Sequence, residues 1–177
     1  VYGGLMAALF EETGRYIAMR FLVKPMDFPN AFMYGAGHGG VEAMLLCGVA
    51  SISNIASAVM INSGTMSAQL ASLDAKKAAD TAAALSALWT TPSLTFFAGG
   101  VERIIAVVLH LSLSILVFQS IRKKSQKDLL NAYLFHFVID SLSVLLSAVA
   151  SVWVVELVVA LVTGGAVLMA KYACMEE

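Results

Sequence analysis

The sequence is poor in charged residues and in cysteine. Only 13% of its 177 residues are charged, whereas a typical soluble domain has about a quarter. The net charge is −1, so no basic surface for nucleic acid is expected. The two cysteines, Cys47 and Cys174, form no Cys-x-x-Cys motif, and we expect two unpaired thiols. These shortages argue against a soluble domain, a nucleic-acid-binding protein and a disulfide scaffold.

Apolar residues are abundant and occur in long runs. They make up 59% of the chain, and the mean hydropathy is +0.83. Crossing the hydrocarbon of a bilayer takes about 20 apolar residues in a helix, and five stretches are long enough: residues 1–21, about 31–62, about 91–121, about 128–150 and about 152–170. The sequence therefore predicts an all-α, polytopic transmembrane helix bundle of about five spans. We expect one transmembrane domain over residues 1–177, in the cell membrane with lipid around it.

Several segments depart from this regular pattern. The first run begins at Val1 without a Met, so we expect an N-terminal part to be missing from this chain. The second run contains four clustered glycines, at which we expect an irregularity in the helix: Gly35, Gly37, Gly39 and Gly40. Residues 63–90 are rich in Ala and Ser and contain two lysines and two aspartates, which predicts a non-spanning connector at the interface.

The positive residues predict the orientation. Positive loops lie on the cytoplasmic side of a membrane. The side reached after the first span receives seven Lys and Arg residues: Arg20, Lys24, Arg122, Lys123, Lys124, Lys127 and Lys171. The opposite side receives only Lys76 and Lys77. We therefore expect the loop of residues 122–127 to be cytoplasmic.

Ionisable residues inside the predicted spans are the strongest functional signal. Each costs on the order of 3 kcal/mol to insert, yet all but one of the spans contain at least two: Glu11, Glu12 and Arg15, then His38 and Glu42, then Glu102, Arg103 and His110, then His136 and Asp140, and finally Glu156. Three pairs have a spacing of four residues, which places both members on one helix face: Glu11 with Arg15, His38 with Glu42, and His136 with Asp140. At helical rise, a carboxylate and three imidazoles lie roughly 12–16 Å from the same membrane side: Glu11, His38, His110 and His136. This common depth predicts a shared polar site. Glu102, Arg103 and Glu156 are interpreted as structural or supporting residues.

The order of these motifs resembles the YhfC family of membrane proteins. The motifs are Glu-Glu-Thr-Gly-Arg at 11–15, Tyr-x3-His at 34–38, Glu-Arg at 102–103 with His110, and His-x3-Asp at 136–140. That family is similar to the CAAX prenyl protease and bacteriocin-processing group of intramembrane proteases, and the resemblance covers most of the chain. It implies an intramembrane peptidase of glutamic or metal-dependent type, acting on a membrane protein or peptide substrate.

The resemblance also implies roles for particular residues. The catalytic set would be Glu11, Glu12, Arg15, His38, His110, His136 and Asp140. Either Glu11 or Glu12 would be the base that activates water, and helical spacing favours Glu11 because it lies four residues from Arg15. The three histidines would position the water, donate to the oxyanion or bind a metal, and Asp140 would orient His136.

Two questions stay open at this level. A zinc site formed by His38, His110 and His136 and a metal-free glutamate mechanism fit about equally well, since no His-Glu-x-x-His motif is present. The buried Glu, His and Asp residues also suit a transporter or proton pathway, although no internal repeat is visible. A non-catalytic membrane scaffold is the third alternative.

Overall fold

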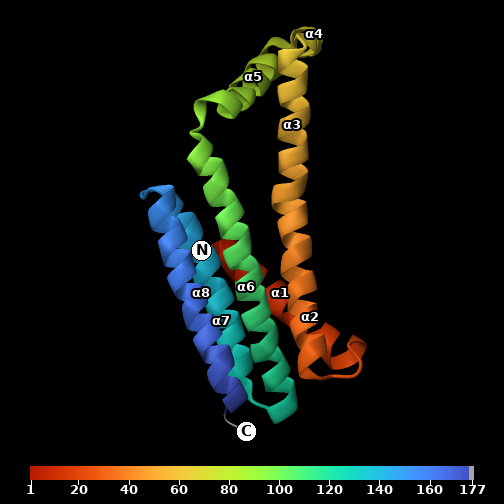
Figure 1. Cartoon of the computed structure of the whole chain (residues 1–177), viewed down its shortest axis with the longest axis vertical. Coiled ribbons are helices and arrows are strands. Elements are labelled where there is room, and N and C mark those ends of the chain that lie inside the picture. Colours follow the sequence, from red (N-terminus) through yellow and green to blue (C-terminus); the bar gives the residue numbers. More distant parts are fainter. Residues whose placement is uncertain (176–177) are drawn as a thin grey trace. The chain divides into compact units, whose positions relative to one another are not determined.

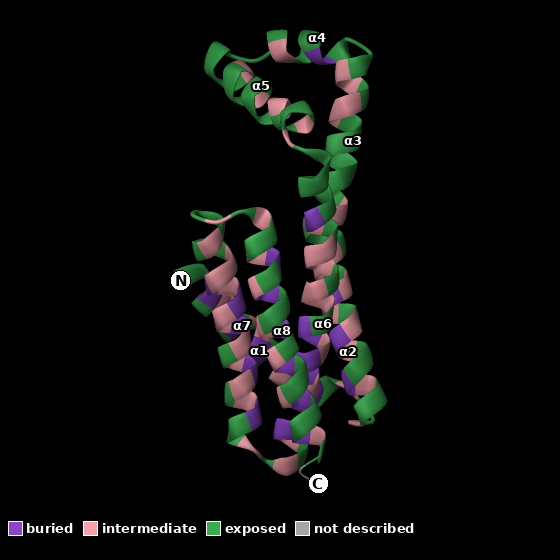
Figure 2. Cartoon of the chain, turned by 60° about the vertical axis from the view of Figure 1, so that its left-hand side comes forward, coloured by how far each residue is buried: buried purple, intermediate pink, exposed green. Residues whose placement is uncertain are grey.

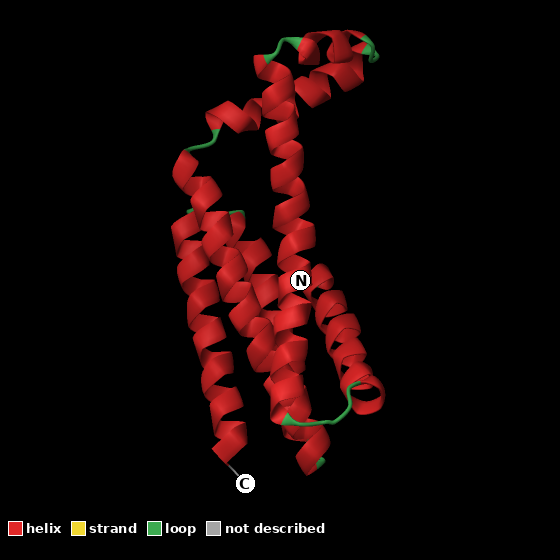
Figure 3. Ribbon diagram, turned by 45° about the vertical axis from the view of Figure 1, so that its right-hand side comes forward, coloured by secondary structure: helices red, strands yellow, loops and turns green. Residues whose placement is uncertain are grey.

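The computed structural model describes residues 1–175, which are helical almost throughout and include no β-strand (Figure 3). The helices are α1 (Tyr2–Ile17), α2 (Phe28–Ala43), α3 (Val49–Asn62), α4 (Thr65–Ala71), α5 (Ala75–Thr90), α6 (Ser93–Lys123), α7 (Gln126–Ser147) and α8 (Val152–Met175) (Figure 1). A wider π-helical turn, Ala18–Leu22, extends α1, and a second, Met44–Gly48, joins α2 to α3. The predicted all-α class is confirmed.

Four helical segments of the described chain are long and apolar enough to cross a membrane: Phe28–Asn62, Ser93–Lys123, Gln126–Ser147 and Val152–Met175. They correspond to four of the predicted spans. The remaining predicted span, residues 1–21, is also helical, but it contains Glu11, Glu12, Arg15 and Arg20. The chain is thus a multi-pass membrane protein whose first helix is distinctly polar.

Contacts divide the chain into two compact units, Val1–Ala43 with the chain from Val101 onward, and Met44–Gly100. In the first unit, α7 packs against both α1 and α8. The buried apolar centre is contributed mainly by α6, through Leu109, Leu113, Leu116, Val117 and Phe118. Smaller residues of the neighbouring helices, such as Ala31, Ala132 and Ala166, pack into the same core.

The helices of the first unit carry both buried and exposed positions (Figure 2), and the types of residue at these positions are the reverse of those in a soluble protein. The largest fully enclosed side chains include Arg15, Gln119 and Glu12, whereas Phe10 and Leu168 are 76% and 67% exposed. In a soluble protein, charged residues are mostly exposed. Charges that face the bundle interior and apolar residues that face outward are what a lipid environment favours.

Two glycines bring α2 against α6. A Cβ added at Gly35 would lie 2.9 Å from the His110 carbonyl oxygen and from Leu111 Cα. At Gly39 it would lie 3.0 Å from Val107 Cα. The prediction of an irregularity at the glycines was therefore wrong: α2 stays regular, and the π-helical turn comes later, at Met44–Gly48. The missing side chains allow close helix packing instead.

The second unit consists of the π-helical turn, α3, α4, α5 and the first turns of α6. Gly64 joins α3 to α4 with φ 77°, a left-handed conformation that glycine adopts without strain. Asp74 caps α5 by accepting a hydrogen bond from the Lys77 backbone N–H at 2.9 Å, and this bond is the main reason that the pKa of the exposed Asp74 carboxyl is lowered. None of the four candidate spans includes residues 63–90, and their role as a non-spanning connector stays a prediction.

Candidate active site

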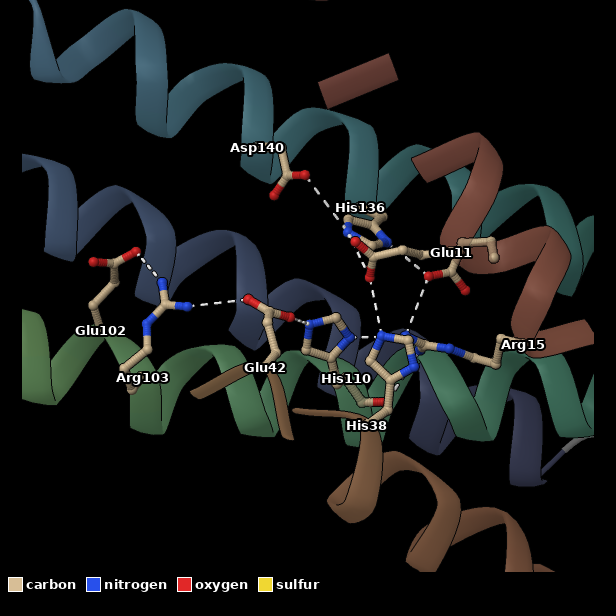
Figure 4. A network of polar contacts seen from close by, with 10 residues as sticks. Glu11, Arg15, His38, Glu42, Glu102, Arg103, His110, His136 and Asp140 are labelled. Atoms are coloured by element: carbon tan, nitrogen blue, oxygen red, sulfur yellow. Dashed lines mark hydrogen bonds and ion pairs between the residues drawn. The ribbon is translucent and has the colours of Figure 1, made fainter. Parts of the chain in front are cut away.

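A network of polar side chains lies inside the first unit, among four of its helices (Figure 4). Helix α1 supplies Glu11, Glu12 and Arg15, α2 supplies His38 and Glu42, α6 supplies Glu102, Arg103 and His110, and α7 supplies His136 and Asp140. The three histidine rings are neighbours: the centroid of His110 lies 4.7 Å from that of His38 and 5.5 Å from that of His136. The structure thus brings together all seven residues of the predicted catalytic set.

The two adjacent glutamates have different surroundings. Glu12 is fully buried, and its Oε1 lies 2.7 Å from His136 Nδ1 and 3.4 Å from Arg15. Glu11 is 35% exposed, and its Oε2 lies 3.0 Å from His38 Nε2. The predicted pairing of Glu11 with Arg15 was therefore wrong, because Arg15 pairs with Glu12, three residues before it. Residues three and four apart both share a helix face, so partners on the other helices decide which carboxylate turns inward.

Arg15 connects α1 to α6. Its guanidinium donates to the backbone carbonyl of His110 at 3.2 Å and to His110 Nδ1 at 2.8 Å. Arginine has no acceptor, so Nδ1 accepts, and a neutral His110 carries its hydrogen on Nε2. That nitrogen faces Glu42 Oε2 at 2.5 Å. Arg15 therefore fixes both the orientation and the tautomer of His110.

Glu42 belongs to this network in a way that its spacing did not predict. Helical spacing paired it with His38, but that prediction was wrong: its carboxylate oxygens contact His110 and Arg103, the latter at 3.0 Å. Arg103 also contacts Glu102 at 2.5 Å. The sequence-based catalytic set omitted Glu42, and the His-x3-Glu spacing on one helix face was the available signal. The interpretation of Glu102 and Arg103 as supporting residues agrees with their place behind Glu42.

His136 is held between carboxylates. Glu12 contacts its Nδ1, while its Nε2 lies 3.6 Å from Asp140 Oδ2 and 3.8 Å from Glu11 Oε2. An ionised carboxylate only accepts, so Nδ1 carries a hydrogen. The pairing of His136 with Asp140 that the spacing predicted is present. The ring is therefore oriented from one side and presents Nε2 to the open part of the site.

A cavity of about 80 Å³ lies against this network. One buried water needs only about 10–15 Å³ of such space, so the cavity is large enough for several. Its wall includes Glu11, Glu42, His110, His136 and Asp140. Water and a polar reactant therefore have room beside the carboxylate of Glu11.

Four residues have the arrangement of a metal-binding group. One ligand atom from each of Glu11, His38, Glu42 and His110 lies within 4.8 Å of the others. Two imidazoles and two carboxylates suit a divalent metal such as zinc, and binding at His110 would displace the hydrogen on Nε2. The group fits a metal, although it differs from the predicted set by having Glu11 and Glu42 in place of His136.

Comparisons with known proteins give one family. The sequence model of a family described as "YhfC intramembrane metalloprotease" matches residues 1–159. A protein of Bacillus subtilis (strain 168) named "Uncharacterized membrane protein YhfC" is 39% identical over 165 residues, which cover 92% of this chain and 63% of the relative. This chain thus spans less than two thirds of that relative's length. No solved structure matches.

Proposed function

The chain belongs to the YhfC intramembrane metalloprotease family, and we propose that it hydrolyses a peptide bond of a membrane-embedded or membrane-adjacent substrate. The reaction takes place in the cavity beside Glu11. The observation that carries the proposal is the 3.0 Å contact between Glu11 and His38 at the edge of a bundle interior that has room for water. A partly exposed carboxylate held by an imidazole is suited to take a proton from water.

Glu11 is the general base in this proposal. It takes a proton from the attacking water, whose oxygen forms a bond to the scissile carbonyl carbon. When the carbon–nitrogen bond breaks, Glu11 gives that proton to the leaving amine, so the carboxylate returns to its starting state. His38 holds Glu11 in place. Glu12 is a poor candidate for this role because it is fully buried and already engaged by Arg15 and His136.

His136 stabilises the oxyanion in this proposal. Its Nε2 lies on the cavity side, within 4 Å of both Glu11 and Asp140. With a hydrogen on both nitrogens, the ring donates from Nε2 to the developing negative charge, while Glu12 holds Nδ1. A positioned donor of this kind contributes about 3 kcal/mol to transition-state stabilisation. Asp140 and Glu12 are positioning residues for this ring.

A divalent metal is compatible with the same site. His38, Glu42 and His110 would hold it beside Glu11, with Arg103 and Arg15 orienting Glu42 and His110. A bound metal of this type supplies Lewis-acid polarisation. The contacts of Arg15 and Arg103 with the ligands are the kind of outer support that fixes ligand geometry in metal sites.

The test is cleavage of a single-span substrate by the purified protein in lipid nanodiscs. Glu11→Gln keeps the size of the side chain and removes the base, and we expect at least a hundredfold loss of rate with an unchanged unfolding temperature. Asp80→Asn is the matched control, because it makes the same chemical change at an exposed position of α5. Equal rates for the wild-type protein and Glu11→Gln would refute the assignment.

A further inference from the structure

A second cavity adjoins the candidate active site. It has a volume of about 350 Å³ and shares Glu102 and Ser143 with the wall of the first cavity. Glu156 of α8 also lines it. Val159, one helical turn further along α8, lines the first cavity. The two cavities are therefore neighbours along the bundle, and we call the second one the acidic recess.

Glu156 is a buried carboxylate with one unsatisfied oxygen. The residue is only 7% exposed, and within the described part of the chain its Oε2 has no hydrogen-bond partner. A buried polar atom left unsatisfied costs about 1–3 kcal/mol. The mechanism proposed above does not use this residue. Its position is explained if a ligand that enters the recess supplies the missing donor.

The polar groups of the recess can accept hydrogen bonds from a ligand, whereas their hydroxyl hydrogens are already donated within the protein. The Ser143 hydroxyl donates to the Asp140 carbonyl at 3.0 Å, and the Ser147 hydroxyl donates to the Val144 carbonyl at 2.9 Å. Among the described residues of the wall, only Glu102 and Glu156 are ionisable. Arg103 contacts one oxygen of Glu102, and no cation contacts Glu156 among the interactions of residues 1–175. The matching ligand is therefore a hydrogen-bond donor with a positive charge.

We propose that the acidic recess binds an organic cation of the substrate, an ammonium or guanidinium group close to the scissile bond, through Glu156. This inference rests on the proposed peptidase function, because that function identifies the ligand as a peptide substrate. Asp140 in the first cavity and Ser147 in the recess are seven residues apart on α7, about 10 Å along the helix. An extended peptide covers that length with about three residues. The recess therefore selects substrates with Lys or Arg within about three residues of the cleaved bond.

Binding is measured in the Glu11→Gln protein, so that cleavage does not interfere. The probes are fluorescent single-span peptides with an acetylated N-terminus that differ only by Lys or norleucine at the test position. We expect the Lys peptide to bind about tenfold more tightly, as one charge-assisted contact predicts. The preference should disappear when Glu156→Gln is added and persist when the control Asp80→Asn is added. A free-amine norleucine peptide should bind no more tightly than its acetylated form; binding as tight as that of the Lys peptide would show that the N-terminus supplies the cation and would overturn the assignment to a Lys or Arg side chain.

Each outcome decides the inference. Equal affinities for the Lys and norleucine peptides, a preference that survives Glu156→Gln, or no binding of either peptide would overturn it. If the wild-type protein cleaves its substrate but shows no Lys preference, the cation site in the recess is refuted and the peptidase function stays intact. A Lys preference in binding without any cleavage by the wild-type protein would refute the peptidase function and leave the cation site in the recess intact.

Discussion

Gly35→Ala tests whether the contact of α2 with α6 positions His38. The added Cβ would lie 2.9 Å from the His110 carbonyl oxygen, from Leu111 Cα and from Ser114 Oγ, and ordinary contacts begin near 3.4 Å. Two of these atoms are backbone, so α2 must retreat by about 0.5 Å. His38 lies one turn after Gly35 and moves with the helix, which lengthens its 3.0 Å contact with Glu11.

The expected magnitudes follow from this displacement. Overpacking costs about 1–3 kcal/mol, and alanine regains about 1 kcal/mol of helix propensity, so the net destabilisation is about 1 kcal/mol. The loss of activity is larger, roughly 10–100-fold, because catalysis is sensitive to small misplacements. Cleavage rate and unfolding temperature are measured together. Gly37→Ala is the control, since no atom lies within 4 Å of its added Cβ. Equal activity of the two variants would refute the positioning argument.

Three further experiments test the buried ion pair, the metal ligands and the membrane orientation. Glu12→Ala leaves Arg15 buried without its carboxylate, and we expect a loss of about 3–5 kcal/mol in unfolding free energy, with Glu12→Gln milder; an unfolding curve like that of the wild type would contradict the ion pair. Purified protein equilibrated with zinc should retain about one equivalent by native mass spectrometry, and His38→Ala and Glu42→Gln should each lose it; unchanged retention in both would exclude these ligands. A cysteine at position 124, in a background without Cys47 and Cys174, should resist an impermeant thiol reagent in intact cells, and rapid labelling would reverse the predicted orientation.

The long apolar runs predicted the spanning helices, because such runs have few alternatives in a membrane, but they did not predict α4 and α5. They also predicted that Glu11, His38, His110 and His136 lie at a common depth. Their actual partners depend on how the helices are rotated against one another, which spacing along one helix does not determine. Spacing correctly predicted the pair of His136 with Asp140. It wrongly predicted the partners of Arg15 and Glu42, which contact Glu12 and His110.

The glycines of α2 also show that the pattern along one helix does not determine how it packs against its neighbours. Clustered glycines favour an irregular backbone when a helix stands alone. In this bundle, Gly35 and Gly39 are covered by α6, and packing keeps the helix regular. The sequence shows where the glycines are, but not which helix packs against them.

The most direct test of the central claim, that Glu11 activates water for peptide hydrolysis, is cleavage in water enriched in ¹⁸O. Mass spectrometry of the product follows the label in the new C-terminal carboxyl group. We expect the wild-type protein to incorporate one ¹⁸O atom per cleaved bond, and folded Glu11→Gln to do so about a hundredfold more slowly or less. Labelling by Glu11→Gln within tenfold of the wild-type rate, or cleavage without ¹⁸O in the product, would contradict the account.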